Sequence, residues 1–132
     1  LQGLAARYGR AARDEAVEEA LRIGEARVRR GLAALPPGRH AIEEEQDDGS
    51  VWRAAVTIAP EDLTVDLRGN PAQQARPVNL SRDGAVIAAQ MVLKALCDPE
   101  RGANAGSFAP LVVLTDPGSV FDADGTAPQG YY

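Results

Sequence analysis

The residues best placed to do chemistry lie where a polar loop, residues 69–79, leads into an apolar segment that begins near Ser81. If that segment is a helix, its first turn offers unpaired backbone N–H groups and a partial positive charge, which suit a carboxylate or a phosphorylated intermediate. Asp66, just before the loop, is a candidate for orienting water or acting as a base, and Asn79 is the second candidate catalytic residue. The sequence therefore predicts an anion-binding catalytic site at this loop-to-helix junction.

Further polar and small residues are candidates for binding the substrate. Four belong to the loop and the helix start, and two belong to a later Asn-x-Gly turn that we expect to close the same pocket. These candidates are Gly69, Asn70, Gln73, Ser81, Asn104 and Gly106. The alternative is structural, because Asp and Asn side chains often bond to their own turns and glycine often supplies a positive φ angle. The sequence leaves both interpretations open.

Several kinds of catalytic site lack the residues that they require. The chain has one histidine, His40, and one cysteine, Cys97, which are too few for a metal site built on these residue types. It has no phosphate-binding loop, no glycine-rich dinucleotide motif and no Gly-x-Ser-x-Gly nucleophile motif. We therefore predict no metal site in this chain, and any ATP or metal chemistry has to come from elsewhere.

A long amphipathic helix is predicted upstream of the junction. Apolar residues, Val17 among them, recur at helical spacing from Asp14 to Leu35, with acidic residues in the first turn and arginines near the end. Pro36-Pro37-Gly38 follows and ends the helix. Gly24 and Gly31 weaken its helix propensity, which indicates that something packs very close to that face.

The second predicted helix begins at Ser81, which is suited to cap it, and ends at Cys97, before an Asp-Pro step. Its side chains are apolar on nearly every side, so we expect it to be buried. Alternating apolar and polar residues predict three antiparallel strands, and a short apolar run predicts a further strand. The predicted strands are residues 39–45, 51–58, 63–68 and 111–115. The fold class is therefore α/β in the mixed α+β sense: a long amphipathic helix, a small antiparallel meander, a buried helix and a further strand, within a larger domain.

Charge and composition limit the partners and the compartment. A net charge of -5 and a pI near 4.8 argue against binding to nucleic acid or to an anionic membrane surface. The single cysteine cannot form an internal disulfide, so we expect a cytoplasmic protein. The chain begins at Leu1, and we expect residues 1–132 to be a single segment of a larger domain that is incomplete at both ends.

One stretch of short motifs carries a resemblance to a known family. Residues 62–73 read Asp-Leu-Thr-Val-Asp-Leu-Arg-Gly-Asn-Pro-Ala-Gln. Residues 76–79, Arg-Pro-Val-Asn, precede the second helix. Asn104-Ala105-Gly106 and Asp116-Pro117-Gly118-Ser119 follow later. In this order the motifs resemble the hydantoinase B/oxoprolinase family. Arg68 and Asn70 depart from it, because the family more often has small hydroxyl residues at these positions.

The resemblance implies part of the B-type subunit of an ATP-dependent cyclic amide hydrolase that opens 5-oxoproline or hydantoin rings. A hydantoinase A-like subunit or domain would bind ATP and phosphorylate the amide oxygen. ATP and a divalent metal are thus expected from other parts of a hetero-oligomeric complex, and the isolated chain is expected to be inactive. Two alternatives stay open: a segment of an acetone- or acetophenone-type carboxylase subunit, and a non-catalytic assembly module.

Overall fold

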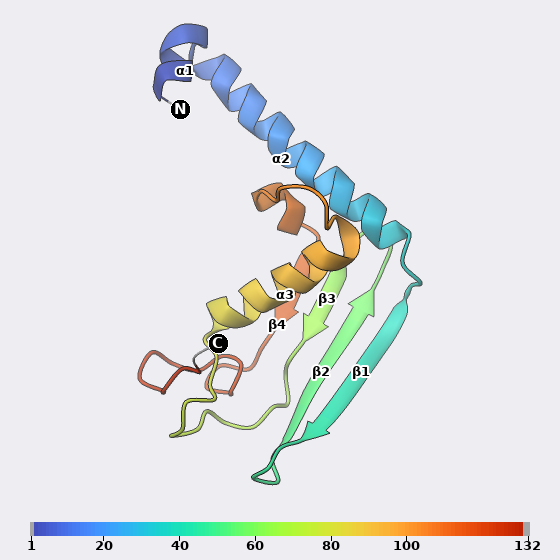
Figure 1. Cartoon of the computed structure of the whole chain (residues 1–132), viewed down its shortest axis with the longest axis vertical. Coiled ribbons are helices and arrows are strands. Elements are labelled where there is room, and N and C mark those ends of the chain that lie inside the picture. Colours follow the sequence, from blue (N-terminus) through green and yellow to red (C-terminus); the bar gives the residue numbers. More distant parts are fainter. Residues whose placement is uncertain (1, 131–132) are drawn as a thin grey trace.

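The computed structural model describes residues 2–130, which form a four-stranded sheet with one long helix across its end and a second helix beside it (Figure 1). The helices are α1 (Gln2–Tyr8), α2 (Arg10–Ala33), α3 (Arg82–Cys97) and the short 3-10 helix η1 (Ala105–Phe108). The strands are β1 (Gly38–Glu45), β2 (Val51–Ile58), β3 (Leu63–Asp66) and β4 (Leu111–Leu114). The predicted mixed α/β class, with a meander and a further strand, is confirmed.

The strands follow one another across the sheet in the order β1-β2-β3-β4. The first three are antiparallel, as a meander requires, and β4 runs parallel to β3. The register aligns Ala41, Ala55, Asp66 and Leu114 in one row. Since side chains alternate between the two faces of a sheet, this row lies on the face opposite Leu63. We call the face with Leu63 the inner face and the face with Asp66 the outer face.

The hydrophobic core lies where the inner face meets both long helices. Its buried members are Val28 and Leu32 of α2, Leu63 of β3 and Leu93 of α3. Partly buried apolar side chains from β2, β3, β4 and η1, from the end of α3 and from the residues just after α2 pack around them. Burying one such side chain contributes roughly 1.5–3 kcal/mol, so this cluster fixes both helices against the sheet.

Helix α2 begins earlier than predicted. Gly9, with a φ of 86°, separates α1 from α2, so α2 starts at Arg10 and has no acidic residue in its first turn. The predicted start at Asp14, with acids complementing the helix dipole, is therefore wrong. Val17, predicted to belong to the packed face, is 45% exposed. The N-terminal half of α2 extends beyond the elements that cover its C-terminal half, as Figure 1 shows.

The two glycines of α2 lie at close contacts, as predicted. A Cβ atom on Gly24 would lie 2.2 Å from the side-chain oxygen of Asn104. One on Gly31 would lie 2.4 Å from the backbone oxygen of Cys97. Gly31 therefore needs a residue without a side chain, and a side chain at Gly24 would require Asn104 to move; the packing partners are η1 and the end of α3.

Helix α3 matches its predicted range, with Ser81 as its N-cap, but it is not buried on all sides. The residues that pack inward are Ala85, Ala89 and Leu93. Ile87 and Met91 are 56% and 69% exposed. The prediction of full burial is wrong for this chain, because the sheet covers one side of the helix only. Within residues 2–130, no helix combines the length and apolar character that crossing a membrane requires.

Candidate functional site

Asp66, the first predicted catalytic residue, ends β3 on the outer face. Its carboxylate accepts hydrogen bonds from Nε and Nη2 of Arg68, both at 2.8 Å, and from the backbone N–H of Arg68 at 3.1 Å. The side-chain hydrogen bond from Arg68 is the main cause that lowers the pKa of Asp66 to about 2. A carboxylate with so low a pKa is a weak base near neutral pH. This geometry therefore favours binding a cationic group or a water molecule over abstracting a proton.

A shallow groove of about 220 Å³ borders Asp66 on the outer face. The small side chains Ala41 and Ala55 lie among its lining residues, and longer charged side chains surround them. These charged residues are Arg39, Glu43, Arg53, Asp66 and Arg68. Arg53 donates from Nε to the Glu43 carboxylate at 2.8 Å. Three guanidinium groups and two carboxylates leave one excess positive charge, which suits a small anion.

Sequence reasoning did not identify this groove, although a signal for it exists. Arg39 and Glu43 flank Ala41 at every second residue of β1, and Arg53 stands two residues before Ala55 in β2. Such spacing places the charged side chains and the alanines on one face. Which residues of the two strands become neighbours then depends on the register, which pairs Glu43 with Arg53.

Gly69 and Asn70, predicted to bind the substrate, form the turn after β3. Gly69 has a φ of 74°, and its backbone N–H donates to Oδ2 of Asp116 at 2.7 Å. The Asn70 side chain bonds to both backbone groups of Arg53 at 2.8 Å and donates to the carbonyl of Leu67 at 2.7 Å. These groups connect the loop to β2 and to the segment after β4, so they are already engaged within the chain.

Gln73 joins the loop to the C-terminal part of the chain. Its amide nitrogen donates to the Asp124 carboxylate at 2.8 Å, and its amide oxygen accepts from the Asp124 backbone N–H at 2.9 Å. Asp124 also accepts from the backbone and hydroxyl of Thr126, at 2.8 and 2.5 Å. The Thr126 hydroxyl is the first cause, and Gln73 the second, that lowers the pKa of Asp124 to about 2.

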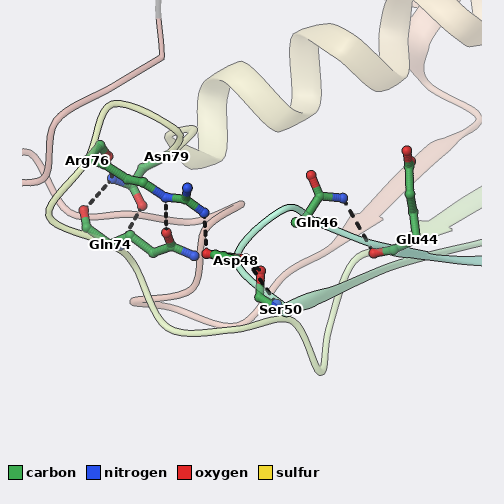
Figure 2. Close-up of polar contacts among 7 residues, drawn as sticks. All are labelled: Glu44, Gln46, Asp48, Ser50, Gln74, Arg76 and Asn79. Atoms are coloured by element: carbon green, nitrogen blue, oxygen red, sulfur yellow. Dashed lines mark hydrogen bonds and ion pairs between the residues drawn. The ribbon is translucent and has the colours of Figure 1, made fainter.

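Asn79, the second predicted catalytic residue, is fully buried. Its Oδ1 accepts from the Gln74 N–H at 2.8 Å. Its Nδ2 donates to the carbonyls of Gln74 at 2.7 Å, Arg76 at 3.1 Å and Pro128 at 2.8 Å. Figure 2 shows this side chain pointing into its own loop, toward Gln74 and Arg76. The amide therefore connects its own loop to the segment at Pro128 and has no free N–H for a ligand in this conformation.

The same loop contacts the tip of the β1–β2 hairpin. Arg76 bonds to the Gln74 side chain at 2.5 Å and pairs with the Asp48 carboxylate (Figure 2). Asp48 also accepts from the hydroxyl and the backbone N–H of Ser50, and the Ser50 hydroxyl is the main cause that lowers the pKa of Asp48. The acidic hairpin tip is otherwise exposed to solvent, as its sequence indicates.

Ser81 caps α3 as predicted. Its hydroxyl oxygen accepts from the Gly84 N–H at 3.2 Å, and its own backbone N–H donates to the Gln129 side chain at 2.9 Å. Asp83 adds a negative charge in the first turn. The start of α3 thus already has its acceptors from the chain itself, which leaves less of its positive end for an external anion.

Asn104 and Gly106 belong to the cap and the body of η1, which follows the C-terminal end of α3 and packs against α2, whereas Ser81 caps the N-terminal end of α3. Asn104 caps η1 by accepting from the Ser107 N–H at 3.2 Å, and it donates to the Ala20 carbonyl of α2 at 2.7 Å. A helix of 16 residues is about 24 Å long. The structure therefore does not bring these two residues to the junction, where we expected them to close the pocket.

The predicted site residues thus fall into three separate places. Asp66 faces the outer groove, and Asn104 and Gly106 pack against α2. The remaining predicted residues form a bonded network of loops around the start of α3; they are Gly69, Asn70, Gln73, Asn79 and Ser81. Within residues 2–130, no group of three or more His, Cys, Asp or Glu side chains is arranged to bind a metal ion.

Comparison with known proteins gives a family match and a structural match. Residues 1–132 match the model of the family described as Hydantoinase B/oxoprolinase. The fold is similar to the crystal structure of an ATP-dependent caprolactamase from Pseudomonas jessenii, with a TM-score of 0.82 and 21% sequence identity. This likeness covers 97% of the present chain and 23% of the caprolactamase chain, and at this identity it shows a shared fold. No curated protein sequence matches the chain.

Proposed function

The chain belongs to the hydantoinase B/oxoprolinase family, and from this premise we propose that it forms part of the B-type subunit of an ATP-dependent enzyme that hydrolyses cyclic amides. The observation that carries the proposal is the family match along the whole chain. The shared fold with an ATP-dependent caprolactamase supports it, because a lactam is a cyclic amide. Rings of the 5-oxoproline or hydantoin type are the substrates that the family name suggests.

The proposed division of labour follows from the chemistry that this chain lacks. An unstrained amide is a poor electrophile, and phosphorylation of its oxygen by ATP makes the ring carbon easier for water to attack. The sequence has no phosphate-binding loop, so ATP binding and the divalent metal are assigned to a hydantoinase A-like partner subunit or domain. The B-type part then receives the activated ring for hydrolysis.

Asp66 is the residue of this chain that we assign to substrate contact in that reaction. It borders the outer groove, where its partly exposed carboxylate is placed to accept a hydrogen bond from the attacking water, while the three arginines of the groove suit the phosphorylated form of the substrate. We assign Asn79 a positioning role, because its amide holds the loop that carries Gly69, Asn70 and Gln73. Arg68 orients the Asp66 carboxylate through two hydrogen bonds.

The test uses the complete enzyme with its ATP-binding partner. It compares two variants in which a carboxylate of the groove is replaced by an uncharged amide. We expect Asp66→Asn to lower kcat/KM for cyclic-amide hydrolysis at least tenfold, which corresponds to about 1.4 kcal/mol of transition-state stabilisation. Glu43→Gln, which removes the other carboxylate of the groove, should keep turnover within about threefold. Both variants should melt within a few degrees of the parent. Equal turnover in Asp66→Asn and the parent would contradict the assignment.

A non-catalytic assembly module is the second candidate function, and one observation favours it. The amide side chains around the start of α3 bond to the chain itself, while a broad apolar area of α3 stays exposed. In that case Asp66→Asn leaves turnover intact, and changes on the exposed side of α3, such as Met91→Glu, reduce assembly of the complex. Size-exclusion chromatography with light scattering, run beside the turnover assay, separates the two functions.

A further inference from the structure

The inner face of the sheet is covered over one half only. Helix α3 approaches β4 at the edge of the sheet, whereas β1 and β2 form the other half, away from the helix (Figure 1). On the uncovered half, Ile42 of β1 is 66% exposed, and it pairs with Ala54 of β2. Met91 of α3 is 69% exposed. Apolar residues therefore continue from the sheet onto the helix without a cover.

Two adjoining apolar hollows lie along this boundary. One, of about 330 Å³, is lined by Ala54 and Val56 of the sheet and by Val92 of α3. The other, of about 490 Å³, is lined by Trp52 of β2 and by Met91 of α3. They share Leu80, Ala88 and Phe121 as lining residues, so they form one continuous groove. A contiguous apolar groove on the surface of a domain is often a binding site.

The dimensions of the uncovered half fit one helix. Neighbouring strands lie about 4.8 Å apart and a helix is about 10 Å wide, so one helix covers roughly two strands of a sheet. Four strands therefore need two helices along the inner face; within residues 2–130, α3 lies along it, whereas α2 contacts it only across one end of the sheet. A neighbouring helix would pack at the usual 8–10 Å from α3, directly above β1 and β2.

Trp52 supplies a second, independent sign that a partner is missing from this face. Its indole N–H is shielded from solvent, yet it has no hydrogen-bond acceptor within residues 2–130. A buried N–H without an acceptor is costly, and most such groups in folded proteins are paired. The Trp52 ring also lines the groove, so the unpaired N–H and the uncovered apolar surface lie together.

We propose that this groove binds an amphipathic helix supplied by hydantoinase B-type sequence beyond these 132 residues. The similar caprolactamase structure favours this source, because the aligned part covers 23% of that chain and the rest is further sequence. A second copy of the present chain fits less well, because each copy carries a net charge of -5 and the β1 border of the groove is acidic at Glu44. The docking helix should direct apolar residues at Ile42 and Met91 and basic residues at Glu44. This proposal does not depend on the reaction that the complete enzyme catalyses.

The test compares two neighbouring residues of β1 whose side chains lie on opposite faces of the sheet. Ile42→Glu places a charge on the inner face beside Ala54, at the β1 border of the groove, and Ala41→Glu places the same charge on the outer face. Both residues are exposed in the chain of 132 residues, so neither change should lower the melting temperature of that chain by more than about 2 °C. In the complete product of the reading frame, Ile42→Glu should lower the melting temperature by at least 5 °C, and Ala41→Glu should not.

Carbene footprinting with mass spectrometry adds a direct measure of coverage in the unmodified proteins. Labelling of Ile42 and Met91 should fall at least fivefold from the 132-residue chain to the complete product, while labelling of Glu100 in an exposed loop stays within twofold. Equal labelling of Ile42 in both proteins overturns the proposal, as does a reading frame that encodes no further sequence. A micromolar dimer of the 132-residue chain that Ile42→Glu separates into monomers would assign the groove to a second copy and also overturns it.

Discussion

At one end of α3, backbone atoms of neighbouring elements touch directly, whereas at the other end side-chain amides connect the loops. The first region, which we call the helix joint, comprises α2, η1 and the end of α3, and Gly31 and Gly106 allow the backbones of its elements to approach closely. The second, the loop lobe, comprises residues 66–80 and 115–130, and Asn79 and Gln73 hold it together.

The two regions differ in how they respond to a substitution. A close contact between backbones fails as soon as one Cβ atom is added, because no rotamer change can relieve the overlap. A network of hydrogen bonds loses one connection at a time, at about 0.5–1.5 kcal/mol for an exposed bond and more for a buried one. We therefore expect the joint to determine whether the chain folds, and the loop lobe to determine how the ends of β3 and β4 are shaped.

The largest effect is expected for Gly106→Ala in the joint. A Cβ atom there would lie 2.0 Å from the Leu21 oxygen and 2.6 Å from the Leu21 carbonyl carbon, so α2 and η1 would have to separate. We expect the free energy of unfolding to fall by about 3 kcal/mol in urea titrations. Gly102→Ala is the matched control, because a Cβ at Gly102 meets nothing within 4 Å, and it should change stability by less than about 0.5 kcal/mol. Similar losses in both variants would contradict the close-contact explanation.

Asn79→Ala, in the loop lobe, should cost less. It removes the acceptor of the Gln74 N–H and leaves the carbonyls of Gln74 and Pro128 without their donor in a buried place. We expect a loss of about 2 kcal/mol, measured by urea unfolding. Gln74→Ala, which removes an amide that bonds only to the Arg76 side chain, should stay within about 0.5 kcal/mol of the parent. If Asn79→Ala cost more than Gly106→Ala, the proposed ranking of the two regions would be reversed.

The sequence predicted the joint better than the loop lobe, and the reason is the range of the interactions. Helical and strand periodicity is local, so α3, the meander and the close packing at Gly24 and Gly31 followed from neighbouring residues. The bond from Asn79 to Pro128 joins residues 49 positions apart, and no local pattern indicates it. Asn79 therefore looked like a free amide beside a helix start.

The exposure of apolar side chains could not be predicted from the periodicity of the sequence either. The pattern of α3 shows which residues are apolar, but it does not show how many neighbours exist to cover them. Met91 and Val17 were therefore expected in contacts that residues 2–130 do not supply. The outer groove depends on the pairing of Glu43 with Arg53, and that register is a property of two strands together.

A smaller effect is expected for the cap of α3, which lies between the two regions. Ser81→Ala removes the acceptor of the Gly84 N–H, and the loss of such a cap typically costs about 1 kcal/mol. Ser81→Asp is the control, because it restores an acceptor and adds a favourable charge at the helix start. Urea unfolding should place Ser81→Ala below the parent and Ser81→Asp close to it. No loss of stability in Ser81→Ala would show that the Gln129 contact to the Ser81 backbone, rather than the cap, holds this end of the helix.

The smallest expected effect is a pH dependence that belongs to the loop lobe and not to the backbone contacts of the joint. Asp66 and Asp124 each have a pKa of about 2, below the usual 3.8, because of hydrogen bonds from Arg68 and Thr126 respectively. Between pH 4 and pH 2 the unfolded chain binds more protons at these groups than the folded chain does, so their contribution to stability is complete above pH 4 and is lost as the pH falls toward 2. The double variant Asp66→Asn with Asp124→Asn should be less stable than the parent at pH 5 and should approach it at pH 2.5. Urea unfolding followed by the fluorescence of Trp52, which packs edge-on against Phe121 at 5.4 Å, measures the difference, and the same difference at both pH values would contradict the assignment.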